Sequence, residues 1–275
     1  MFIRTILVAS YILSCFCLLV PPWRFFYLNK NYFNKQKGIY SKQAINNLIP
    51  EAYQLNQWFD HADCEPKHYP VFVKPEWGQN SKGVQRVDNL DELKAVRRKF
   101  LASYEPRPLL VQESAQGVTE FEVFMLANPK SADHYACLSV IQVVNTTQNP
   151  LPVNGIHNPD TSYLDISSEF SPAQLRQLWS FLSPIGHFKI CRFGIKADSK
   201  DKLLTGQFKI IEINLLLPMP MVLLTTNRSL KTKIGLAIRL TWKMALLTQG
   251  EGQYNWLRTK LDRSLIPSNT KQGER

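Results

Sequence analysis

Residues 208–214 (FKIIEIN) limit the possible folds of this chain more than any other segment does. Four of these seven residues are apolar, so we expect a buried strand. Glu212 and Asn214 lie two positions apart and therefore face the same side of it. A buried carboxylate is costly unless a cation compensates it, and a carboxylate beside an amide oxygen suits Mg²⁺. An ion pair with Arg192, on a neighbouring expected strand, is the alternative.

A second expected strand, residues 71–74, ends in a lysine that is followed by proline. A lysine at the end of a strand reaches phosphate as a point charge. Gly78, Ser81 and Gly83 follow in a polar loop, whose backbone N–H groups are suited to cover phosphates. The Walker string of P-loop proteins is absent from the sequence. A plain hairpin is the alternative interpretation.

A third expected strand, residues 109–111, leads into Gln112 and Glu113, and Glu120 follows seven residues after Glu113. Such a strand offers backbone hydrogen bonds to an adenine edge and a carboxylate to ribose hydroxyls. Two exposed strand glutamates are the plainer interpretation, because glutamate is rarely buried.

The net charge of +11 favours anionic partners, which include nucleic acid, an anionic membrane face and nucleotide phosphates. The sequence has no zinc-ligand spacing and no aromatic ribonucleoprotein motif, so no nucleic acid is expected as a partner. The plain interpretation of the excess positive charge is a solvated basic surface that partly faces a membrane. The five cysteines are scattered and give no disulfide framework, which suits a reducing compartment.

Residues 6–20 contain no charged side chain, and three interpretations stay open. A membrane anchor needs about 20 apolar residues, a length that this run reaches only with its flanking residues. A cleaved secretory signal fits Arg4 and the short apolar core, and a buried or interfacial helix is the third interpretation. More basic residues follow the run than precede it. The positive-inside tendency therefore places the rest of the chain in the cytoplasm, or on the cytoplasmic face of a membrane.

Cap and periodicity signals predict the remaining elements. Asn89 with Glu92 three residues later forms a capping-box pattern, and Ser171 before Pro172 is typical of a helix start. Helices are thus expected at 41–48, after Asn89, after Ser171 and at 230–247. Residues 145–165 are expected to form one long loop, which in a compact domain is usually functional or disordered.

The order of the three strand motifs resembles the ATP-grasp superfamily, and in particular its D-alanine–D-alanine ligase-like branch. The resemblance covers about residues 40–221 and rests on FVKPEWGQNSKGV, LLVQESAQGVTEFEV and RFGIKADSKDKLLTGQFKIIEINLLLP. It implies an α+β ATP-grasp fold, in which two α+β lobes bind ATP between them. An N-terminal hydrophobic segment precedes the two lobes in the sequence. The expected division is a hydrophobic segment 1–23, a basic linker with a short helix 24–68, a small lid lobe 69–112, a larger lobe with metal-binding strands 113–228, and a basic amphipathic helix and tail 229–275.

The resemblance also implies a role for each motif residue. ATP would be bound by Lys74, by Gly78, Ser81 and Gly83 over the triphosphate, by Gln112 and Glu113 at adenine, and by Glu120 at the ribose. Arg192 would stabilise an acyl-phosphate or tetrahedral intermediate, and Glu212 and Asn214 would hold Mg²⁺.

Two places differ from the pattern of that branch. Gly194 stands where an acidic residue usually follows the arginine, so one metal ligand is missing. Residues 215–218 (LLLP) replace small or polar residues. The predicted function is an ATP-dependent carboxylate–amine ligase that acts through an acyl-phosphate, with both substrates unidentified. The alternatives are a non-catalytic ATP-binding module tethered to a membrane by residues 5–23, and a membrane-associated structural protein.

Overall fold

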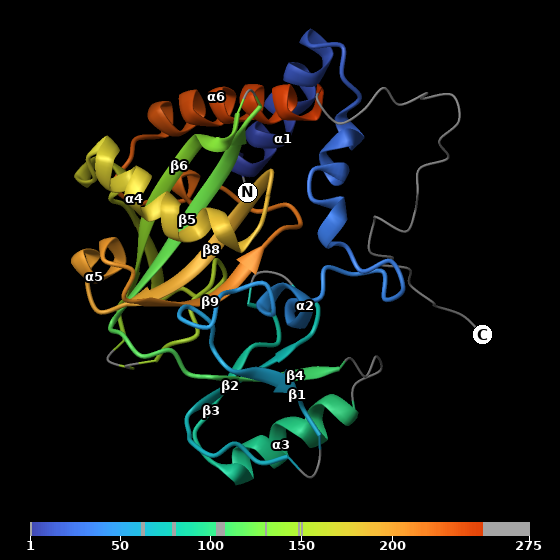
Figure 1. The fold of residues 1–275 in the computed structure, drawn as a ribbon, viewed down its shortest axis with the longest axis vertical. Coiled ribbons are helices and arrows are strands. Elements are labelled where there is room, and N and C mark those ends of the chain that lie inside the picture. The colour runs from blue at the N-terminus through green and yellow to red at the C-terminus, as the bar shows by residue number, and fades with distance from the viewer. Residues whose placement is uncertain are drawn as a thin grey trace.

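Two antiparallel sheets organise the chain into a small and a large lobe (Figure 1). The computed structural model describes residues 2–249, except 62–63, 79–80, 103–107, 130, 148 and 150. The small sheet has the order β1-β4-β2-β3. Its elements are β1 (Gln57–Phe59), β2 (Val71–Pro75), β3 (Gln85–Val87), β4 (Leu109–Glu113) and the covering helix α3 (Leu90–Leu101).

The large lobe is built on a sheet of order β7-β6-β5-β8-β9. Its strands are β5 (Thr119–Asn128), β6 (Ser131–Asn145), β7 (Thr161–Asp165), β8 (Ile190–Ala197) and β9 (Phe208–Asn214). The strand expected at 208–214 is therefore confirmed. Residues 161–165 pair with β6 as β7, and Asn145 is the last residue of β6, so the connection is residues 146–160 and the loop expected at 145–165 is wrong at both ends.

Helices cover both faces of the large sheet. One face, with Phe121, Val123 and Phe193, packs against α4 (Pro172–Leu182) and α5 (Lys200–Leu204). The opposite face, with Phe124 and Leu126, packs against α6 (Leu230–Gln249) and α1 (Phe2–Cys17). The remaining helical elements are α2 (Lys42–Asn46), η1 (Pro22–Tyr27), η2 (Lys30–Tyr32), η3 (Ser167–Glu169), η4 (Ser183–Ile185) and η5 (Met221–Leu223).

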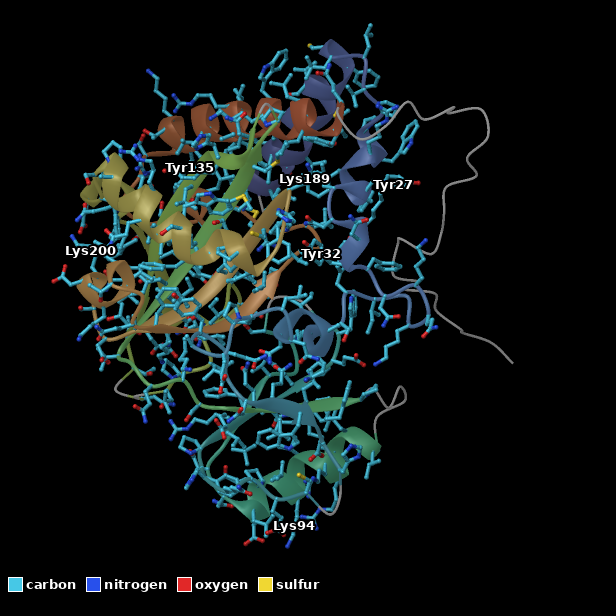
Figure 2. All side chains as sticks on the ribbon, viewed as in Figure 1. Tyr27, Tyr32, Lys94, Tyr135, Lys189 and Lys200 are labelled. Carbon is cyan, nitrogen blue, oxygen red and sulfur yellow. The ribbon has the colours of Figure 1, made fainter. Side chains whose placement is uncertain are left out.

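Helix starts follow the cap signals of the sequence. Asn89 accepts a hydrogen bond from the Glu92 N–H, and Ser171 and Gln174 form a complete capping box at α4. Ser41 likewise caps α2. The segment between α1 and α2 runs along the side of the large sheet, where the ring of Tyr32 lies 4.7 Å from that of Phe188 (Figure 2).

The N-terminal hydrophobic run forms α1, which lies against α6 (Figure 1). Of the three interpretations, the membrane-spanning anchor is not supported, because none of the described helices is long and apolar enough to cross a membrane. The first residue and the tail from residue 250 onward lie outside the described residues.

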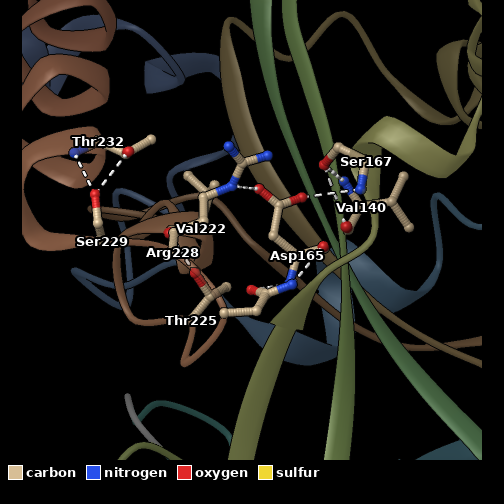
Figure 3. A network of polar contacts seen from close by, with 9 residues as sticks. Val140, Asp165, Ser167, Val222, Thr225, Arg228, Ser229 and Thr232 are labelled. Carbon is tan, nitrogen blue, oxygen red and sulfur yellow. Dashed lines mark hydrogen bonds and ion pairs between the residues drawn. The ribbon is translucent and has the colours of Figure 1, made fainter.

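The start of α6 is fixed to the sheet through Asp165, whose side chain is 1% exposed (Figure 3). Arg228 donates from Nε to Asp165 Oδ2, and Ser167 N–H donates to Oδ1 at 2.8 Å. Asn227 completes the link through two hydrogen bonds with the Asp165 backbone. A buried carboxylate held by a cation and backbone donors is stable there, so α6 is held over one face of the sheet.

Candidate functional site

A cleft that is open to solvent lies between the two sheets. Clefts between lobes are common positions for small-molecule sites. Side chains of β2 and β4 line it from the small lobe, and side chains of β5, β8 and β9 line it from the large lobe. The loop between β6 and β7 contributes residues 151–156.

The floor of the cleft is the polar half of one sheet face. Glu120 and Glu122 of β5 alternate with core residues, and Arg192 and Lys196 do the same on β8. Successive side chains of a strand point to opposite faces of the sheet. The charged residues therefore line the cleft, while their neighbours pack in the hydrophobic core on the other face. Asn154 donates to Glu120 Oε2 at 2.8 Å, and burial raises the pKa of Glu120.

Lys74 enters the cleft from β2 and is 5% exposed. Its Nζ donates to Gln112 Oε1 at 2.9 Å and to the Ile211 carbonyl at 3.5 Å. Burial, assisted by the nearby Lys42, lowers the pKa of Lys74 to about 7, although Glu212 opposes the shift. Within the described part of the chain no carboxylate forms an ion pair with Lys74, so its charged form is available to an anion.

Gln112 ties the two lobes together, because its Nε2 donates to the Ile211 carbonyl at 3.1 Å. That carbonyl is accessible because of a register shift in the β8–β9 pair: Gly194 opposes Glu212 whereas Ile195 opposes Ile210. Ile211 is thus the extra residue of a bulge, a feature common next to active sites. It turns the strand so that Glu212 faces the cleft.

Arg192 lies between two carboxylates on the floor. Its Nε is 3.0 Å from Glu122 Oε2, and its Nη2 is 3.6 Å from Glu212 Oε1. Burial alone would raise the pKa of Glu212, but Arg192 and Lys42 outweigh it and hold this pKa below its usual value. The ion pair between Glu212 and Arg192 that the sequence left open is therefore formed.

Glu122 is a residue that sequence reasoning missed. It is 8% exposed, and burial raises its pKa to about 8. On the sheet Glu122 stands directly opposite Gly194, the position that lacks the expected acid. The alternation in TEFEVF, which places Glu122 on the same side as Glu120, is the signal that identifies it.

The loops expected to bind phosphate lie over the cleft in part. Ser81 lines it and donates to the Asn154 carbonyl at 2.7 Å, which joins the glycine loop to the β6–β7 loop. Gly83 has a φ of +79°, and a Cβ on it would lie 3.3 Å from Pro75. Gly78 lines an adjacent pocket instead of the main cleft.

The structure brings together most of the residues that the sequence singled out. The main cleft is lined by Lys74, Ser81, Gln112, Glu113, Glu120, Arg192 and Glu212. Asn214 faces the adjacent pocket with Gly78, while Glu212 lines both pockets. Gly83 is part of neither lining among the described residues.

Glu212 and Asn214 supply oxygen donors that suit a magnesium ion. Asn214 Nδ2 donates to Glu212 Oε1 at 2.7 Å, which leaves the amide oxygen of Asn214 and one carboxylate oxygen as ligands. Across the described ranges, no group of three or more His, Cys, Asp or Glu side chains is placed to hold a metal ion. The donors therefore fit Mg²⁺ only with further oxygens from a substrate, the usual arrangement for Mg²⁺ at phosphates.

Two α+β lobes with a charged cleft between their sheets are the ATP-grasp fold, and this chain has that fold. Among solved structures, it is similar to an L-amino acid ligase from Bacillus licheniformis, with 18% identity and a TM-score of 0.50. The match covers 79% of this chain and 51% of the ligase chain. A D-alanine–D-alanine ligase from Bacillus anthracis matches with 13% identity and a TM-score of 0.48, over 77% of this chain and 69% of that chain.

Sequence comparison adds a weaker likeness. Acetyl-CoA carboxylase 1 of Arabidopsis thaliana is 27% identical over 109 residues, which are 40% of this chain and 4% of the carboxylase. No family model matches the sequence. The chain thus spans about half the length of the L-amino acid ligase and a small part of the carboxylase. The likeness to the L-amino acid ligase shows the fold alone, because one fold can serve many activities.

Proposed function

We propose that this protein binds ATP between its lobes and is an ATP-dependent carboxylate–amine ligase that acts through an acyl-phosphate. The single observation that carries the proposal is the meeting of Lys74, Arg192 and Glu212 in one cleft, because these residues come from three strands far apart in the sequence. The ligases with the same fold are a secondary support.

The positions of the candidate ATP-binding residues support this proposal. Lys74, a buried cation with a Gln112 contact, binds the phosphates, and the loop that contains Ser81 closes over them. The strand end at Gln112, which is buried, and Glu113, which is half-buried, faces adenine. Glu120, which already accepts a hydrogen bond from Asn154, accepts one from a ribose hydroxyl. Each contact uses a group that the cleft presents to its interior.

The chemistry is a phosphoryl transfer followed by acyl transfer. A carboxylate oxygen of the first substrate attacks the γ-phosphorus and ADP leaves, which gives the acyl-phosphate. An amine then attacks the acyl carbon and releases inorganic phosphate. Arg192 neutralises the charge that develops in both steps, and Glu122 holds its guanidinium in place. Mg²⁺, held by Glu212 and Asn214 together with phosphate oxygens, supplies further charge neutralisation when bound.

The test of binding is calorimetric titration of ATP into the full chain, with and without Mg²⁺. Lys74→Met is expected to weaken binding at least about 100-fold, since a buried phosphate contact is lost. Lys94→Met is the matched control, because Lys94 is an exposed lysine on α3 at the far end of the small lobe (Figure 2). Absence of ATP binding in the unaltered chain would contradict the proposal.

The test of catalysis is release of ADP when panels of carboxylates and amines are added together with Mg²⁺. The ligase releases ADP and phosphate in equal amounts and only when both substrates are present. Arg192→Lys is expected to bind ATP but to lose turnover, because lysine cannot reproduce the planar, two-sided contact of arginine.

A second candidate is an ATP-binding module without catalysis, held at a membrane. Gly194 favours it, because the acid expected there is absent from β8. The exposed Leu217 in the run after β9 also favours it, because substrate-binding polar residues are missing there. ATP binding with no ADP release in any substrate pair, from protein that is demonstrably folded, supports this candidate over the ligase.

A further inference from the structure

Helix α1 carries apolar side chains on both its inner and its outer side, and Arg4 is its one charged residue. Its inner side chains, among them Ile3, Leu7 and Tyr11, pack into the cluster that α6 forms on the large sheet. A helix with apolar residues all round is normally enclosed on all sides, in a large core or in lipid. The packing against α6 covers one side of α1, so the opposite side needs a second explanation.

That opposite side is exposed and contiguous along the helix. Large side chains that repeat at helical spacing face solvent there, followed by two more after the helix: Phe2, Val8, Ile12, Leu13, Phe16, Leu19 and Trp23. Leu19 is 93% exposed and Phe16 is 68% exposed. We call these residues the α1 outer face. Contiguous exposed apolar patches of this kind mark sites that bind a protein or a membrane.

The charged side chains of α1 and α6 are all basic. Residues 1–50 contain no Asp or Glu, and neither do residues 229–249, which include α6. The basic residues of these two segments are Arg4, Arg24, Lys30, Lys35, Lys231, Lys233, Arg239 and Lys243, together with Lys37, which pairs with Glu76, and Lys42, which lines the pocket beside Lys74. They account for nearly the whole net charge of +11, so the rest of the chain is close to neutral.

We propose that the α1 outer face docks on a lipid bilayer that carries anionic headgroups, with α1 lying in the plane of the surface. The apolar side chains enter the boundary between headgroups and acyl chains, as in other interfacial helices. Arg4 on α1 and Arg239 on α6, both exposed, face the headgroups. Trp23 is exposed beside α1, and tryptophan is a residue type that favours the membrane interface.

Charge decides between lipid and other occupants. A second copy of this chain would bring an equally basic surface against the first, and like charges would oppose the contact. An anionic bilayer satisfies both the apolar and the basic groups at once. The docking does not depend on the nucleotide cleft, which lies at the other end of the β5 and β8 strands from α6.

The experiment is co-sedimentation of the full chain with phosphatidylcholine vesicles, with and without phosphatidylserine. We expect binding that requires phosphatidylserine and weakens as salt is raised. Leu13→Ser with Phe16→Ser is expected to lower the partition coefficient at least about tenfold, since two large apolar side chains no longer insert. Leu101→Ser, at an equally exposed leucine on α3, is the matched control and is expected to bind as the unaltered chain does.

A second double variant tests the electrostatic contribution to vesicle binding. Arg4→Gln with Arg239→Gln is expected to lower partitioning about fivefold for each charge removed, whereas Arg98→Gln on α3 changes nothing. All variants are first checked for folding by circular dichroism and thermal melting. Unchanged vesicle binding of the α1 double variant overturns the proposal. So does a dimer of the unaltered chain that ignores vesicles and that the α1 double variant dissociates.

Discussion

Lys74 shows how a single buried charge couples binding to pH. Burial and Lys42 lower its pKa from 10.5 to about 7, so it is largely neutral above that pH in the native state. The unfolded chain keeps the proton up to about pH 10.5, and the native state therefore gains stability as pH rises from about 7 to 10.5. A bound phosphate reverses this balance, because it favours the charged amine.

We predict that ATP binding at about pH 8 takes up a proton at Lys74, because the free amine is mostly neutral there. Titration in two buffers of different ionisation enthalpy measures it as a difference in apparent binding enthalpy. Lys74→Arg keeps a permanent charge and is expected to bind with no such difference. A buffer-independent enthalpy in the unaltered chain would show that Lys74 is already protonated.

Arg192 carries a second residue-scale prediction. Its removal leaves Glu122 and Glu212 in the cleft floor without their shared cation, and loss of one partner from a buried pair costs about 3–5 kcal/mol. We expect Arg192→Gln to lower the free energy of unfolding by that amount in urea titrations. Lys200→Gln breaks an exposed pair with Glu169 and is expected to cost no more than about 1 kcal/mol.

At the scale of elements, the sequence predicted those helices and strands that depend on interactions between residues close together in the chain. Asn89 and Ser171 cap the helices that the sequence assigned to them, because a cap depends on atoms within three residues. Strand β7 was missed for the opposite reason. Residues 161–165 have weak alternation of their own and form a strand by pairing with β6, a contact made between distant segments.

The candidate site, like the helices and strands, could be predicted from the sequence only in part. The lysine, the arginine and the glutamate that meet in the cleft each stand on a strand with a clear pattern. The bulge at Ile211 and the position of Glu122 opposite Gly194 depend on strand register, which the sequence does not specify locally. The contribution of residues 151–156 depends on how a long loop folds back over the sheet.

The connection between the two sheets carries an element-scale prediction. Gly117 follows β4 with a φ of +116°, and a Cβ there would lie 2.9 Å from the backbone of Ala197. We expect Gly117→Ala to destabilise the protein by about 2 kcal/mol or more, because both backbone strain and overlap result. Gly235→Ala in α6, where a Cβ meets nothing within 4 Å, is expected to stabilise by about 0.5–1 kcal/mol. Equal melting temperatures of the two variants would contradict this.

At the scale of the whole molecule, the cleft and the helical layer of α6 and α1 lie over the same face of the large sheet. Glu122 of the cleft and Phe124 beneath the helical layer stand two residues apart on β5. The same strand thus supplies charge to the cleft at one end and apolar packing to α6 at the other. If α1 lies on a membrane, the cleft is held at a fixed distance from it by this shared strand, with the small lobe beyond it (Figure 1).

Closure of the lobes is the last prediction. Ser81 of the small lobe contacts Asn154 of the large lobe through its hydroxyl, so both loops are expected to become ordered together when ATP binds. Hydrogen exchange of the amides at 81–84 and 151–156 should slow at least about tenfold with ATP and Mg²⁺, because local opening is suppressed. The amides at 93–98 of α3 lie away from the cleft and should not change. Ser81→Ala removes the hydrogen bond between the two loops. Residues 151–156 are then expected to lose their protection, because their link to the small lobe is removed. Residues 81–84 keep their protection if phosphate alone orders them.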